Sequence, residues 1–107
     1  MFRSKIKSTA TQLGVRVVFA GSRDAALTAM QSEAPALVIL DLNNTRTDPV
    51  DTLTAIKRDS ALASIPVVGF VSHVDVATID AAKAAGIDEV LARSAFTMKL
   101  PELLAGR

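Results

Sequence analysis

Residues 36–44 read Ala-Leu-Val-Ile-Leu-Asp-Leu-Asn-Asn, a short apolar run that ends at an acid. Pro35 precedes the run, and its length and apolar character predict a strand buried on both faces, as in a parallel sheet. Asp41 stands where this strand should pass into a loop. Ligands of open α/β sheets bind at the carboxyl ends of the strands, so the pattern places Asp41 at a candidate site. An acid that merely caps the loop would fit the same pattern.

The composition predicts one soluble α/β domain over residues 1–107 with an aliphatic core. Half of the residues are apolar, and all four aromatic residues are Phe. A net charge of +1 gives no reason to expect nucleic acid or an anionic membrane as a partner. The absence of Cys excludes disulfides and thiolate chemistry, and one His cannot form a His-rich metal cluster. No apolar run reaches membrane-spanning length, and we expect a cytoplasmic protein.

Helical and strand-like patterns alternate along the whole chain. Glycine ends and Ser or Asp caps mark several boundaries. Because Pro101 cannot sit deep in a helix without a kink, we expect a turn and then a short helix at the C-terminal end. This alternation predicts βαβ units and a parallel sheet with helices on both faces. The expected strands are 15–20, 36–41, 65–71 and 88–92, and the expected helices are 2–13, 23–32, one from Pro49, 76–85 and 94–104.

The chain resembles the receiver domain of bacterial two-component response regulators over essentially all of its length. The anchors are the strand Leu37-Val-Ile-Leu-Asp41, the segment Ile65-Pro-Val-Val and the segment Ala85-Gly-Ile-Asp-Glu-Val-Leu-Ala-Arg93. The resemblance implies a CheY-like, flavodoxin-like doubly wound sheet with strand order 2-1-3-4-5. It also implies phosphoryl transfer to Asp41, with charge neutralised by Mg²⁺, a lysine and a hydroxyl. A sensor histidine kinase or another signalling protein is the partner that it implies.

The chain departs from this family pattern at three places. It begins at the first helix, so the first strand and its acidic metal ligands are either absent or lie upstream of Met1. Arg93 falls at the lysine position, and Ser94 follows it where the family usually has proline. Val71 falls at the hydroxyl position, with Ser72 one residue later. The resemblance therefore implies phosphate contacts from Arg93 and Ser72, unless Ser72 is an ordinary loop serine. Asp41 would be a metal ligand without its partner acids.

Other polar residues near the expected sheet ends have simpler explanations. Asp48, His73 and Asp75 lie on the same rim as Asp41, but caps and loop positions account for them equally well. Asp88 and Glu89 begin the last strand at the opposite end of the sheet, and we interpret them as surface charge.

A missing first strand would leave an apolar slot between the strands at 15–20 and 36–41. Each large apolar side chain absent from such a slot forfeits about 1.5–3 kcal/mol, and a domain is stable by only about 5–15 kcal/mol. The strand at 15–20 would have to close onto 36–41, giving four strands and five helices, or two chains would have to pair their edges. We expect a homodimer.

These observations favour a receiver-like signalling domain, degenerate or truncated, that acts through protein–protein contacts of its last helices and strand. A working phospho-acceptor that uses Asp41 with Mg²⁺ is the alternative. A small α/β ligand-binding module is a third hypothesis, although Gly21 stands alone and no glycine-rich phosphate cradle is present. Since no nucleophile elbow or metal cluster occurs, we do not expect an enzyme.

Overall fold

The structure, a computed structural model, describes residues 2–44, 48–72 and 75–106. The part of the chain that it describes contains three strands and five helices, which alternate after the first two helices. The helices are α1 (Phe2–Leu13), α2 (Arg23–Ser32), α3 (Pro49–Arg58), α4 (Val76–Ala84) and α5 (Arg93–Leu104). The strands are β1 (Val38–Asp41), β2 (Val67–Val71) and β3 (Glu89–Ala92).

The three strands form one parallel sheet in the order β1-β2-β3. Val38 pairs with Val67 and Asp41 with Phe70, so the carboxyl ends of β1 and β2 lie side by side. All five residues of the central strand β2 are buried. A parallel strand between two neighbours is covered on both faces, which explains why the sequence of β2 is apolar throughout.

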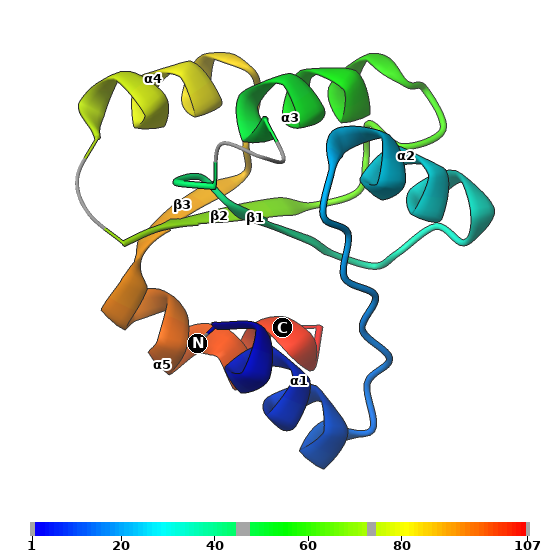
Figure 1. The fold of residues 1–107 in the computed structure, drawn as a ribbon, viewed down its shortest axis with the longest axis vertical. Coiled ribbons are helices and arrows are strands. Elements are labelled where there is room, and N and C mark those ends of the chain that lie inside the picture. Colours follow the sequence, from blue (N-terminus) through cyan, green and yellow to red (C-terminus); the bar gives the residue numbers. More distant parts are fainter. Residues whose placement is uncertain (1, 45–47, 73–74, 107) are drawn as a thin grey trace.

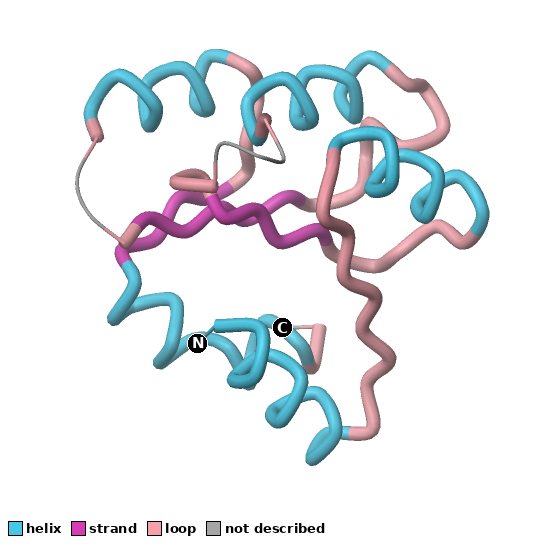
Figure 2. The backbone as a smooth tube through the Cα atoms, in the orientation of Figure 1, coloured by secondary structure: helices cyan, strands magenta, loops and turns pink. Residues whose placement is uncertain are grey.

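Helices cover both faces of the sheet. Helices α2, α3 and α4 lie on one face, and α1 and α5 lie on the other, with both chain ends on the α1–α5 side (Figure 1). The same layers are seen with the strands in magenta between helices in cyan (Figure 2). This arrangement confirms the parallel sheet with helices on both faces that the alternating pattern predicts, and it agrees with the doubly wound, flavodoxin-like fold class that the resemblance implies.

Each face of the sheet has its own apolar core, because successive side chains of a strand point to opposite faces. Val67 and Val71 of β2 belong to the cluster under α2, α3 and α4. Phe70 belongs to the cluster under α1 and α5, where its ring stacks on Phe96 at a centroid distance of 4.5 Å. Ile6 of α1 is buried in the same cluster.

Helix boundaries follow the local signals in the sequence. Ser22 caps α2 by accepting a hydrogen bond from the backbone N–H of Ala25 at 3.1 Å. Gly14 follows α1 with φ +70°, and Gly86 follows α4 with φ +97°, a region that favours glycine. The expected bounds of α1 and α2 are therefore confirmed.

Two expectations are wrong. Residues 15–20 form no strand: the segment runs from α1 to α2 along one side of the molecule, and none of its residues joins the sheet (Figure 1). An extended segment becomes a strand only when a neighbour pairs with its backbone, and β1 pairs only with β2 in the described part of the chain. The second error concerns Pro101, which lies inside a continuous α5. Phe96 and Leu100 of the same helix are fully buried, so packing of α5 against the sheet keeps the helix continuous through the exposed proline.

Candidate functional site

Asp41 is the last residue of β1 and lies half-buried at the carboxyl end of the sheet. Its Oδ1 accepts a hydrogen bond from the backbone N–H of Asn43 at 3.0 Å. No hydrogen bond from a described residue to Oδ2 occurs in the structure. The chain therefore holds one oxygen of the half-buried carboxylate.

The loops after β1 and β2 are joined beside Asp41. The backbone N–H of Leu42 donates to the carbonyl of Phe70 at 3.0 Å, which extends the β1–β2 pairing by one residue. The side-chain Oδ1 of Asn43 then accepts a hydrogen bond from the backbone N–H of Ser72 at 2.6 Å. Sequence reasoning missed this contact, because the two residues are far apart in the chain and no local signal connects them.

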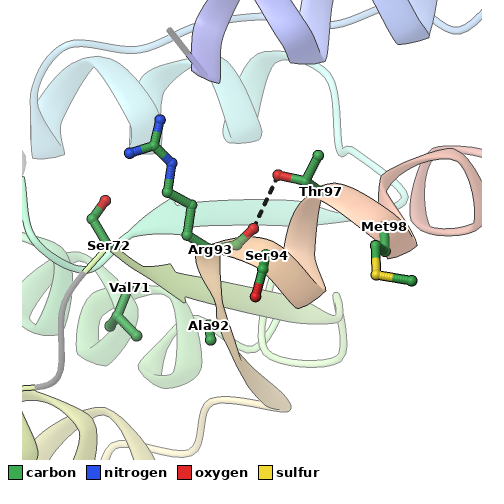
Figure 3. A pocket seen from close by; sticks show the side chains of 7 residues that line it. All are labelled: Val71, Ser72, Ala92, Arg93, Ser94, Thr97 and Met98. Atoms are coloured by element: carbon green, nitrogen blue, oxygen red, sulfur yellow. Dashed lines mark hydrogen bonds between the residues drawn. The ribbon is translucent and has the colours of Figure 1, made fainter.

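Ser72 and Arg93 line one pocket at the carboxyl ends of β2 and β3 (Figure 3). Their side chains extend to the same side, whereas Val71 and Ser94 point away from it (Figure 3). The pocket has a volume of about 600 Å³, and Asp41 is not among its lining residues. The structure therefore brings Ser72 and Arg93 together and places Asp41 next to this pocket rather than in it. The lining residues are Val71, Ser72, Ala92, Arg93, Ser94, Thr97 and Met98.

Two other acids were expected on the same rim as Asp41. The structure gives Asp75 a structural role and shows no role for Asp48. Asp75 caps α4, because its carboxylate accepts hydrogen bonds from the backbone N–H of Thr78 at 3.2 Å and from the hydroxyl of Thr78 at 2.6 Å. Asp48 precedes α3 with φ +47°, and its side chain makes no capping hydrogen bond. His73 lies outside the described residues.

The described residues contribute few ligands for a magnesium ion. Mg²⁺ takes six oxygen ligands in near-octahedral geometry, usually with one or two carboxylates and several waters or phosphate oxygens. Among residues 2–44, 48–72 and 75–106, no group of three His, Cys, Asp or Glu side chains could hold a metal ion. Among these residues, Asp41 is the acid that ends a strand at the site, so they would supply one carboxylate, and waters or phosphate oxygens would have to complete the ligand shell.

Asp88 is more than surface charge. It lies just before β3, at the end of the sheet opposite Asp41, as expected, but its Oδ2 accepts hydrogen bonds from the backbone N–H of Val67 at 2.7 Å and from Nζ of Lys57 at 3.2 Å. The hydrogen bond from Val67 is the main reason that the pKa of Asp88 lies below its ordinary value, and Lys57 lowers this pKa further. These contacts link α3, β2 and β3 far from the site.

Comparisons with known proteins agree with the fold. The family model of the response regulator receiver domain matches residues 1–105. No curated protein matches the chain. A solved structure of the chemotaxis protein CheY4 from Vibrio cholerae superposes with a TM-score of 0.80 at 20% sequence identity, over 97% of this chain and 87% of that chain.

Two further solved structures show the same fold. The receiver domain of NtrX from Brucella abortus has a TM-score of 0.79 and 23% identity, over 95% of this chain and 85% of that chain. The Mn²⁺-bound form of the response regulator Rcp1 has a TM-score of 0.76 and 18% identity, over 94% of this chain and 82% of that chain. Separately, no helix among the described residues is long and apolar enough to cross a membrane.

Proposed function

Because the chain belongs to the response regulator receiver domain family, we propose that it signals through protein–protein contacts and does not by itself carry out metal-dependent phosphoryl transfer to Asp41. The main support is Val71. It falls at the position where the family resemblance implies a hydroxyl, yet it is an aliphatic side chain that is 6% exposed and packed in the core. A buried valine cannot donate a hydrogen bond to a phosphoryl oxygen.

The neighbouring residues support the same proposal. Asp75, the acid after β2, is engaged in capping α4, and Arg93 replaces the lysine of the family. Arginine keeps the positive charge, but its planar guanidinium presents a different shape and reach from an ammonium group. The site thus retains the phospho-acceptor position without the same set of groups around it.

Phosphodonor labelling tests this proposal directly. The chain is incubated with acetyl phosphate and Mg²⁺, and phosphoryl adducts are detected by intact mass spectrometry. We expect no adduct beyond the background of Asp41→Asn, in a protein shown by circular dichroism to be folded. An adduct that requires both Mg²⁺ and Asp41, and that persists in the matched loop variant Asp48→Asn, would overturn the proposal.

A working phospho-acceptor is the second candidate, and the geometry of Asp41 favours it. Asp41 lies at the carboxyl end of β1 and is only half-buried, and no described residue donates a hydrogen bond to its Oδ2, as a carboxylate nucleophile would require. Positive charge beside a transferred phosphoryl group stabilises its oxygens, and Arg93 with Ser72 in the adjoining pocket could supply contacts. The labelling experiment separates the two candidates, because only this one gives an adduct that depends on Asp41.

The partners that we propose are a sensor histidine kinase or another signalling protein, together with a second copy of the chain. β1 is an edge strand of the sheet, and its outer side has no backbone partner among the described residues. The apolar segment 15–20 also makes no strand pairing there. Exposed strand edges promote association with another chain, which supports a homodimer.

A further inference from the structure

Asn43 makes two hydrogen bonds that join the two loops of the site. Its backbone N–H donates to Oδ1 of Asp41 at 3.0 Å, and its side-chain Oδ1 accepts from the backbone N–H of Ser72 at 2.6 Å. We propose that Asn43 is a positioning residue that couples the Asp41 carboxylate to the loop beginning at Ser72.

Asn43 continues the connection between the strands where backbone pairing ends. The last backbone hydrogen bond between the β1 and β2 segments in the described chain runs from Leu42 to Phe70. Beyond it, the backbone N–H of Asn44 donates to the carbonyl of Asp41 at 3.1 Å, which turns the chain back on itself. The Asn43 side chain therefore replaces the next backbone contact between the two loops.

Coupling follows because one residue makes both contacts. The Asp41 carboxylate fixes the backbone of Asn43, and that backbone fixes the direction of the amide that holds Ser72. Removal of Oδ1 as an acceptor would release the backbone N–H of Asn43. Ser72 lines the same pocket as Arg93, the first residue of α5 (Figure 3).

A plain loop contact predicts a different behaviour. If Asn43 only fastened Ser72, the state of the Asp41 carboxylate would not affect the Ser72 amide. Any role of this coupling in signalling rests on the proposed function. It exists in the unmodified chain, however, so its test needs no phosphodonor and its outcome is independent of the labelling result.

Amide hydrogen exchange, measured by NMR on the full chain, tests the coupling. The readout is the exchange rate of the Ser72 amide relative to that of the Asp88 amide, which donates to the Val67 carbonyl at 3.0 Å at the opposite end of the sheet. Loss of one hydrogen bond changes an equilibrium by roughly fivefold. We expect Asn43→Ala and Asp41→Ala each to raise the ratio by about this factor, and the double variant to raise it no further.

Two variants serve as matched controls. Asn44→Ala removes an amide one residue further along the loop and retains both contacts of Asn43, so the ratio should stay at its wild-type value. Asp41→Asn keeps an oxygen that can accept from Asn43, so it should also preserve the ratio. An unchanged ratio in Asp41→Ala would overturn the coupling, as would equal acceleration of the Ser72 and Asp88 amides in both alanine variants.

Discussion

Gly69 lies in the middle of β2, and the structure leaves no room there for a side chain. A Cβ on Gly69 would lie 2.8 Å from Cδ1 of Ile87 and 2.8 Å from Cδ1 of Leu42, with Cγ of Leu42 at 2.9 Å. Carbon atoms in favourable contact are about 3.5–4.0 Å apart. Leu42 is 4% exposed and belongs to the core under α2, α3 and α4, so Gly69→Ala must displace it or its neighbour.

The expected effect is a loss of stability of about 1–2 kcal/mol. Overpacking a core costs about 1–3 kcal/mol, and the lower entropy of the unfolded alanine chain returns about 0.4–1 kcal/mol. Urea unfolding monitored by circular dichroism measures the difference. Gly21→Ala is the matched control, because a Cβ there meets nothing within 4 Å. Its free energy of unfolding should equal that of wild type or exceed it by up to about 1 kcal/mol, because only the entropy of the unfolded chain changes there.

A double-mutant cycle tests the assigned cause. Leu42→Ala alone should cost about 2–5 kcal/mol. In that background Gly69→Ala should cost nothing or should stabilise, because the added methyl group fills part of the vacated space. Residues in contact show coupling energies of about 0.5–3 kcal/mol. A Gly69→Ala variant as stable as wild type, or one that costs the same in both backgrounds, would refute the steric argument.

Three further predictions follow from the contacts elsewhere in the fold. The pKa of Asp88 lies below its ordinary value, so its ionised form stabilises the fold above the unfolded pKa, and this contribution disappears as pH falls through the folded pKa. Urea midpoints measured from about pH 6 to about pH 3 should therefore fall more steeply for wild type than for Asp88→Ala. Ser22→Ala removes the acceptor of the Ala25 N–H and should lower the free energy of unfolding by about 1 kcal/mol, as measured by urea titration. Light scattering should give a dimer mass that declines on dilution, and a monomer mass at every concentration would contradict the proposed homodimer.

Local signals were sufficient to predict the helices and three of the strands. The bounds of α1 and α2 match because Gly14 adopts a positive φ and Ser22 caps its helix. The prediction of a strand at 15–20 was wrong, although the side chains of this segment alternate as in a strand. Val17 and Phe19 do pack on the cluster under α1 and α5, but backbone pairing depends on a neighbouring strand that the segment's own sequence cannot supply. The prediction of a turn before a short C-terminal helix was also wrong. Here the tertiary packing of α5 overrides the local helix-breaking effect of Pro101.

The sequence predicted only those site residues that a local sequence pattern identifies. Asp41 could be located because it ends an apolar strand, and the structure confirms that position. Its assignment as a phospho-acceptor remains a prediction, as do the phosphate contacts of Ser72 and Arg93. Asn43 could not be identified, because its bond to Ser72 depends on the β1–β2 register, which the sequence of neither strand specifies alone.

The position of Asp41 depends on one ladder of the sheet and on the core behind it. Because β1 is an edge strand in the described sheet, its only backbone neighbour is β2, and Asp41 pairs there with Phe70. Phe70 in turn stacks on Phe96 of α5, which is fully buried. The same helix carries Arg93 at its first residue. Movement of α5 against the sheet would therefore shift Arg93 directly and Asp41 through the stacked rings of Phe70 and Phe96. The positions of both charged groups thus depend on how α5 packs on the sheet.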